Sequence, residues 1–257
     1  MFSSIRLRQQ ASPRRGLTLV ELVVVLTILV ALGGLIVPMI PSMLAKTHRA
    51  KCAVTIPEIN KLWITKYSGD VVYPDAYDSM ITGTSLFNAL PGGDAGGEVS
   101  AGTLTADEAD ALAAIGVTTV IDHATYTAGQ NATLDSPTTP RPLAGGGAVA
   151  LLNNAGASVI SLGIDVAKYS PDTKFVVLGI GNGCDACGPK GLMVEAPTHF
   201  GGEDVMNPVE YYQRYCVIFA VSETDGAAEF VCACSIHPDG FDGGETHIHD
   251  YYEAQQG

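Results

Sequence analysis

The longest apolar segment of the chain lies close to its N-terminus. No residue from Leu22 to Ala45 carries a charge, a run of 24 positions. Because a helix rises 1.5 Å per residue, a helix of this length can cross a bilayer core of about 30 Å. Nothing comparable occurs later in the chain, so the pattern predicts one membrane-spanning helix.

The helical pattern continues beyond this segment. Apolar side chains recur at helical spacing in the stretch that follows, at Ile56, Ile59, Leu62 and Trp63. We therefore expect the helix to leave the membrane near Lys46, to continue to about Tyr67 and to end at Gly69. Pro57 lacks a backbone donor and should bend or interrupt this outer half.

The rest of the chain alternates turn signals with short helix and strand patterns. The stretch TADEADALAAIGV predicts a helix, because Thr105 and Glu108 have capping-box spacing and Gly116 follows as a stop. VTTVIDHATY predicts a strand. The prolines and small polar residues of 131–147 predict a long irregular loop, and the glycines of 91–102 predict another.

Three further strand patterns lie in the C-terminal half: KFVVLGIG, YYQRYCVIFAVS and AEFVCACSI. The last two flank ETDGA, which is a strong hairpin signal. Together these patterns predict an α+β head in which a helix packs on an antiparallel sheet.

Charge is divided unevenly along the chain. Residues 1–16 hold four arginines and no acid, whereas 25 acids and only five bases occur from Tyr67 onward. A segment with a balance of −20 repels phosphate backbones, so we expect no nucleic-acid partner for the head. The basic N-terminus should stay in the cytoplasm, and the acidic head should lie outside.

A single carboxylate, Glu21, lies where the apolar segment begins. Burying such a charge in lipid costs several kcal/mol, so its presence needs a reason. A cleaved secretory signal does not fit, because the apolar segment is too long and no A-x-A site follows it. A twin-arginine signal built on Arg14 and Arg15, or a plain uncleaved anchor, leaves Glu21 without a role.

The segment RRGLTLVELVVVLTILVALGGLIVP, residues 14–38, resembles the class III signal of the type IV pilin superfamily. In that family a basic leader ends in Gly, an apolar residue follows the cut, and Glu is the fifth residue of the mature chain. Gly16, Leu17 and Glu21 match these positions. The resemblance covers residues 1 to about 60 and implies a type IV pilin-like α+β fold, with a long N-terminal hydrophobic helix packed on an antiparallel sheet.

The resemblance also implies roles for individual residues. A prepilin peptidase would cut between Gly16 and Leu17 and then N-methylate Leu17. In a filament, Glu21 would pair with the positive N-terminus of a neighbouring subunit, which lowers the cost of burying both charges. Pro38 lies where the family often weakens the helix. The implied domains are a leader (1–16), a filament-core helix (17–45), an outer helical half (46–68) and an extracytoplasmic head (69–257).

The family further implies a structural subunit, most closely a pseudopilin of a type II secretion system that polymerises to drive protein export. Its partners would be copies of itself, other pilin-like subunits, the prepilin peptidase/methyltransferase and an inner-membrane assembly platform. It would cross the inner membrane once before joining a periplasmic or extracellular filament. A membrane-tethered binding module and an adhesive or uptake pilin are the alternatives.

The head carries no recognisable catalytic signature. Gly179, Gly181 and Gly183 follow a strand, but the full G-x-G-x-x-G motif is missing and no long helix follows. The sequence has no nucleophile elbow and no His in a catalytic motif. We therefore expect no enzymatic activity.

Six cysteines follow the apolar segment: Cys52, Cys184, Cys187, Cys216, Cys232 and Cys234. An exported head meets an oxidising compartment, which favours disulfides, either between the Cys184/Cys187 loop and the Cys232/Cys234 strand or locally between Cys184 and Cys187. Free buried thiols and a four-sulfur zinc site are the alternatives. Cys52 is expected to stay a buried thiol on the helix. An odd hairpin loop would place Cys216 on the same strand face as Cys232 and Cys234, and an even loop would place it on the opposite face.

The C-terminal stretch HPDGFDGGETHIHDYYE combines oxygen donors with glycines. Asp239, Asp242 and Glu245 suit calcium, and major pseudopilins as a family hold calcium near the C-terminus. His247 and His249 would instead suit a transition metal. A solvated acidic loop without a cation is the third alternative.

Overall fold

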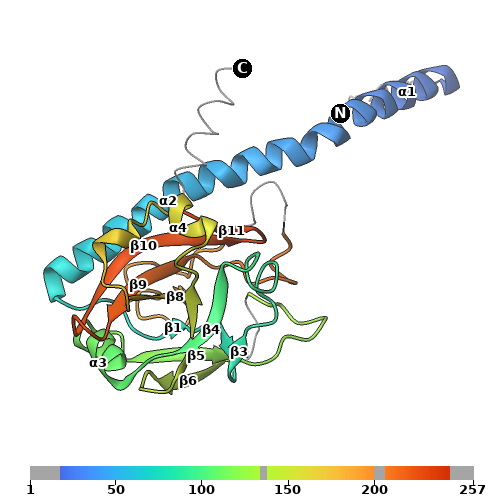
Figure 1. The fold of residues 1–257 in the computed structure, drawn as a ribbon. Coiled ribbons are helices and arrows are strands. Elements are labelled where there is room, and N and C mark those ends of the chain that lie inside the picture. Colours follow the sequence, from blue (N-terminus) through green and yellow to red (C-terminus); the bar gives the residue numbers. More distant parts are fainter. Residues whose placement is uncertain (1–17, 134–137, 200–205, 244–257) are drawn as a thin grey trace, which may run out of the picture. The chain divides into compact units, whose positions relative to one another are not determined.

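The computed structural model describes residues 18–133, 138–199 and 206–243 (Figure 1). The chain forms two compact units, Met1–Met43 and Leu44–Gly257. The leader predicted for residues 1–16 lies outside the described residues, as do Leu17, Glu245, His247 and His249.

The first unit is built on the apolar helix α1 (Leu19–Ile36). None of its residues is buried within the structure, and its composition is strongly apolar throughout. It is long and apolar enough to cross a membrane. A short 3-10 helix, η1 (Val37–Met39), follows it, so the helical hydrogen-bond pattern changes at Pro38.

Helix α2 (Ile40–Asp70) begins in the first unit and belongs to the second from Leu44 onward. The prediction that Pro57 could interrupt this helix is wrong: the helix is continuous through it, and Pro57 lies on the exposed side. The carbonyl that a proline leaves without a donor can bond to water there. The helix ends at Asp70 rather than at Gly69, and Val71 supplies the left-handed backbone (φ 61°) that follows.

Among the described residues, nine strands form one sheet, so the chain is α+β with a large mixed sheet. They are β1 (Tyr77–Asp78), β4 (Val99–Thr103), β5 (Thr119–His123), β6 (Thr138–Pro142), β7 (Ala148–Leu152), β8 (Lys174–Gly179), β9 (Cys216–Ser222), β10 (Ala227–His237) and β11 (Gly240–Asp242). The main order is β11-β10-β9-β8-β1-β5-β6, and β7 joins β8 to β4. The expected purely antiparallel sheet needs correction, because β1 and β5 pair in parallel.

The sheet separates two hydrophobic cores. Residues alternate between them along β9: Val217 and Phe219 enter the first core, whereas Ile218 and Ala220 enter the second. The buried stripe of α2 fills the first core with Cys52, Ile56, Ile59 and Trp63. In Figure 1 this part of α2 lies along one face of the sheet. The predicted packing of the outer helical half on a sheet is therefore confirmed.

Helix α3 (Ala106–Ala114) forms where the sequence predicts it. The hydroxyl of Thr105 accepts a hydrogen bond from the backbone N–H of Glu108, and the Glu108 carboxylate accepts one from the N–H of Thr105. Gly116 follows with a φ of 98°, which glycine adopts without strain. The buried Glu108 carboxylate also pairs with Lys174 at 2.8 Å, which ties the helix to β8.

The expected irregular loop at residues 131–147 contains a strand and is a second correction. Strand β6 pairs with β5 and places Pro140 opposite Ile121 and Pro142 opposite Thr119. Because β6 is the last strand of the sheet, its prolines need no partner on the outer side. The remaining elements are the hairpin β2 (Ile81–Thr82) and β3 (Ser85–Leu86), helix α4 (Ala157–Ser161) and the 3-10 helix η2 (Val166–Lys168).

Candidate functional site

The N-terminal end of α1 is built as a capping box around Thr18 and Glu21. The Glu21 Oε2 atom accepts hydrogen bonds from the Thr18 N–H at 2.8 Å and from the Thr18 hydroxyl at 2.9 Å. The Thr18 hydroxyl in turn accepts one from the Glu21 N–H at 3.3 Å. The sequence analysis missed this motif, although T-x-x-E spacing was visible.

Glu21 is exposed, and so is the apolar surface around it. Leu19 is 79% exposed and Val30 is 67% exposed, values typical of polar surface residues rather than of core side chains. The helix therefore presents a continuous apolar surface with one carboxylate at its N-terminal end. Lipid or other apolar helices can cover such a surface, whereas water covers it at a high free-energy cost. The cleavage position, Gly16 and Leu17, lies outside the described residues.

The cysteines divide between the two cores. Cys52 and Cys184 are buried in the first core, and Cys187 packs against it. Cys216 and Cys234 are buried in the second core, and Cys232 packs against that one. All six are free thiols in the structure. Cys184 and Cys187 thus lie on one side of the sheet, whereas the side chains of Cys232 and Cys234, on strand β10 of that sheet, face the other side. The structure does not bring these two predicted partners together.

Cys184 and Cys187 are neighbours in one turn, where the N–H of Cys187 donates to the carbonyl of Cys184 at 2.8 Å. Cys52 on α2 accepts a hydrogen bond from the Tyr215 hydroxyl at 3.3 Å, so it is a buried thiol as predicted. Burial raises the pKa of Cys184 and Cys234, which keeps both as unreactive thiols at neutral pH.

Cys216 and Cys234 lie directly opposite each other on β9 and β10. The hairpin loop between Ser222 and Ala227 has four residues, and an even loop alone would place these two side chains on opposite faces. A β-bulge between Phe230 and Cys232 shifts the register by one residue and returns them to the same face. The number of residues in the hairpin loop does not reveal this bulge, so the sequence alone could not predict the face on which Cys216 lies.

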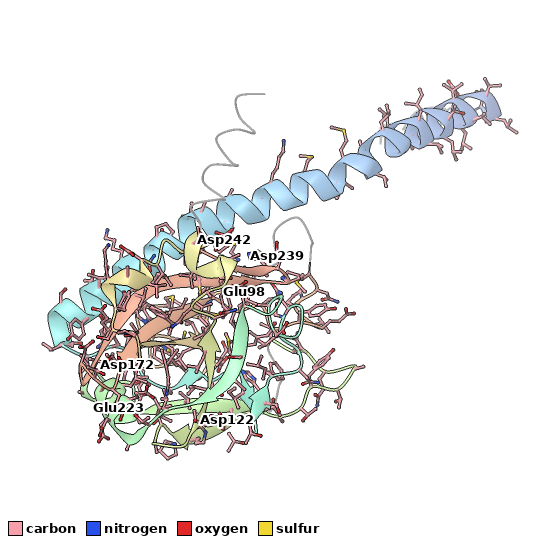
Figure 2. All side chains as sticks on the ribbon, viewed as in Figure 1. Glu98, Asp122, Asp172, Glu223, Asp239 and Asp242 are labelled. Atoms are coloured by element: carbon pink, nitrogen blue, oxygen red, sulfur yellow. The ribbon has the colours of Figure 1, made fainter. Side chains whose placement is uncertain are left out.

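The acidic residues of the head are spread over several of its elements, as Figure 2 shows for six of them. Several have partners within the protein. Glu98 accepts hydrogen bonds from the backbone of Ala157 and Ser158 at the start of α4. Asp122 pairs with Arg141 at 2.7 Å. These carboxylates therefore stabilise the fold as well as adding negative charge.

Two of the three predicted calcium ligands are described. Asp239 is exposed in the turn between β10 and β11, and Asp242 is half-exposed at the end of β11, opposite Ser235. Glu245 lies outside the described residues. Within the parts of the chain that the structure describes, no three His, Cys, Asp or Glu side chains gather in a metal-binding group. Calcium binding there stays a prediction.

The three glycines after β8 are explained by packing. A Cβ on Gly179 would lie 1.9 Å from the Tyr212 hydroxyl, and one on Gly181 would lie 2.2 Å from a carboxylate oxygen of Asp78. A Cβ on Gly183 would lie 2.3 Å from the side chain of Ile121. These close approaches require glycine, so the pattern does not indicate a phosphate-binding loop.

The glycines make room for a buried polar group that sequence reasoning missed. The Tyr212 hydroxyl donates to Asp78 at 2.7 Å, and His123 Nε2 lies 3.7 Å from the same carboxylate. Burial raises the pKa of Asp78 and lowers the pKa of His123, so both favour their neutral forms. The three residues are far apart in the sequence, so no local motif indicates this group. The group lies beneath the surface rather than in an open cleft.

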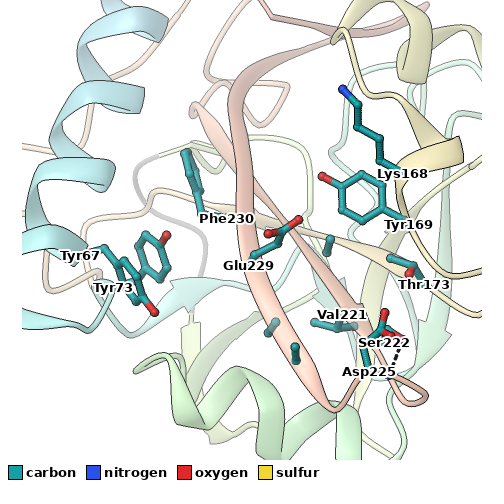
Figure 3. Close-up of a pocket in the computed structure, with 13 residues that line it drawn as sticks. Tyr67, Tyr73, Lys168, Tyr169, Thr173, Val221, Ser222, Asp225, Glu229 and Phe230 are labelled. Atoms are coloured by element: carbon teal, nitrogen blue, oxygen red, sulfur yellow. Dashed lines mark hydrogen bonds between the residues drawn. The ribbon is translucent and has the colours of Figure 1, made fainter.

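A hollow of about 520 Å³ borders the β9–β10 hairpin (Figure 3). On one side of it the rings of Tyr67 and Tyr73 stack with their centroids 4.5 Å apart, and Phe230 lies on the same side. Tyr169 and Glu229 lie on the other side. Phe230 packs against the first core and Tyr169 against the second, so the lining comes from both faces of the hairpin. Burial and the neighbouring Glu229 carboxylate raise the pKa of Tyr169 to about 12.

No protein-family model matches the chain, and neither curated proteins nor solved structures give a significant match.

Proposed function

We propose that the protein is a structural subunit of a type IV pilin-like filament, most closely a pseudopilin of a type II secretion system. The observation that carries the proposal is the exposed apolar helix α1 with Glu21 at its N-terminal end, directly after the leader-like sequence. An ordinary anchor would need only the apolar surface, because lipid covers it equally well without a carboxylate.

The proposal gives Glu21 a partner that a lone subunit lacks. Cleavage after Gly16 would create a positively charged amino group at Leu17. In a bundle of such helices, that amino group and the Glu21 carboxylate of a neighbour would each be costly to bury alone and less costly together. The pair would therefore set the axial offset between neighbouring helices in the filament.

The capping box supports this role, because the Thr18 hydroxyl and N–H hold the carboxylate in one place at the helix start. The change to a 3-10 turn at Pro38 supports it in a second way. A local break in the hydrogen-bond ladder would let the apolar part adjust its direction when helices pack in a filament.

The partners follow from this assignment. The chain would insert once into the inner membrane, with its basic N-terminus in the cytoplasm and its acidic head outside. The prepilin peptidase/methyltransferase would process it, and the assembly platform would add it to other copies and to related subunits. The exported filament would act mechanically, so the head needs no catalytic centre.

Variants at Glu21 and Thr18 separate the charge of the carboxylate from its capping role. Glu21→Gln keeps a side chain that can complete the capping box but removes the charge. We expect this variant to be processed and inserted normally and to assemble poorly, because only the filament needs the charge pair. Thr18→Val removes the capping hydroxyl and keeps the charge, so it should assemble far better than Glu21→Gln.

The measurement is the fraction of processed subunit recovered in sheared, sedimentable fibres, with total processed subunit as the reference. Equal assembly of Glu21→Gln and the parent chain would show that the charge has no role. Loss of assembly in Thr18→Val alone would assign the role to the helix cap instead.

A further inference from the structure

A second hollow, of about 630 Å³, lies on the head away from the hairpin hollow of Figure 3. Separate parts of the chain border it. They include the loop after β8, with Asn182 and Cys187, and the segment containing Glu195 and Thr198. Thr133, which follows β5, and Arg214, just before β9, complete the part of the lining used below. This hollow takes no part in the proposed filament contacts of α1.

Arg214 is the unusual member of this lining, because it is only 2% exposed. Its Nη1 donates to the carbonyl of Ala196, and its Nη2 lies 3.5 Å from the carbonyl of Thr133. Both residues line the same hollow, so the guanidinium is directed at its wall. The Nε–H has no hydrogen-bond partner among the described residues.

Among the residues that the structure describes, no bonded anion balances the charge of Arg214. Among the described residues its bonded partners are neutral carbonyl oxygens, and no ion pair involves it. The nearby carboxylate of Asp78 is bonded to the Tyr212 hydroxyl instead. A buried guanidinium without an anion is costly, and a buried donor without an acceptor adds to that cost.

We infer that this hollow is a binding site for a carboxylate ligand, whose oxygens would bond to Arg214. A planar carboxylate matches the fork of guanidinium donors. A singly charged carboxylate also suits a head with a formal charge of −20 better than sulfate or phosphate, which carry more charge and are repelled more strongly. The exposed amide of Asn182 supplies a further donor at the rim.

Glu195 provides a way to test the site without disturbing the core. Its side chain is exposed at the rim, so replacement should not affect folding. Its negative charge opposes an incoming carboxylate. Glu195→Gln should therefore bind the ligand more tightly than the parent chain, whereas Arg214→Gln should not bind it.

Cys187 lines the hollow and supplies the readout, because it is half-buried and can be alkylated. The full-length protein in detergent would be treated with iodoacetamide in acetate, in chloride or in sulfate at equal ionic strength, and each cysteine would be followed by mass spectrometry. Acetate should slow the alkylation of Cys187 in a saturable way. Cys232, half-buried against the other core, is the matched control and should react at the same rate in all three salts.

We expect half-maximal protection of Cys187 at a lower acetate concentration in Glu195→Gln than in the parent. Unchanged Cys187 reactivity in acetate, in both the parent and Glu195→Gln, would overturn the proposal even if Arg214→Gln fails to fold. Stronger protection by sulfate than by acetate would overturn the assignment to carboxylates. None of these outcomes depends on filament assembly, so the proposal is tested independently of the proposed function.

Discussion

At the scale of single residues, Asp78 shows how burial changes chemistry in this head. Its carboxylate is enclosed by Tyr212, His123 and the backbone of Gly179 and Gly181, and burial is the largest cause of its raised pKa. A carboxyl whose pKa is higher in the folded state binds its proton more tightly there. Its stabilising effect is complete below the unfolded pKa of about 4 and is lost as the pH rises through the folded pKa.

Asp78→Asn tests this directly. The amide cannot ionise, and its oxygen can still accept the Tyr212 hydrogen bond. We expect the free energy of unfolding of the variant, relative to the parent, to increase as the pH is raised from about 4 to neutrality. Urea unfolding followed by the fluorescence of Trp63, the single tryptophan, measures it. A difference that stays constant with pH would contradict the raised pKa.

At the same scale, the sequence alone identified a candidate functional residue at the N-terminus but did not identify the polar group in the interior of the head. Glu21 could be singled out because a charge stands out against an apolar run. The Asp78, His123 and Tyr212 group could not, because the residues are 45 and 89 positions apart along the chain and only the folded sheet brings them together.

At the scale of secondary-structure elements, helix α3 is held at its start by the Thr105 hydroxyl. Thr105→Ala should lower the free energy of unfolding by about 1 kcal/mol, because the N–H of Glu108 loses its acceptor. Thr105→Ser keeps the hydroxyl and should stay close to the parent. Urea unfolding of the three proteins checks this, and an Ala variant as stable as the Ser variant would show that the cap contributes nothing.

Some of the helices and strands could be predicted from the sequence, and others could not. Capping boxes and hairpin turns are local, so α3 and the β9–β10 hairpin could be predicted from a few residues. The bulge between Phe230 and Cys232 is visible only in the register of the paired strands, and no local sequence signal marks it. Strand β6 could not be predicted because its prolines are typical of a loop. They are tolerated in the strand because it lies at the edge of the sheet.

At the scale of the whole molecule, electrostatic repulsion between the acidic subunits opposes the assembly that their apolar helices favour. Removal of the four leader arginines leaves ten bases against 27 acids, a formal charge of −17 on each subunit. Subunits of like charge repel, and salt shortens the range of repulsion from about 30 Å at 0.01 M to about 3 Å at 1 M. We therefore expect the purified, processed subunit to assemble more readily at high ionic strength.

Sedimentation of fibres across a series of sodium chloride concentrations checks this expectation. Sucrose at matched viscosity controls for changes in diffusion. Assembly that declines steadily with added salt would show that attraction between opposite charges, rather than repulsion between heads, controls the process.

The central claim is that the chain is processed as a pilin-like subunit, and mass spectrometry of its N-terminus tests that claim most directly. The protein would be isolated from cells that contain a prepilin peptidase, with a peptidase-deficient strain as the control. The account predicts a mature chain that begins at Leu17 and carries an N-methyl group, found only when the peptidase is present. A chain that still begins at Met1 in both strains would contradict the account and favour a membrane-tethered binding module.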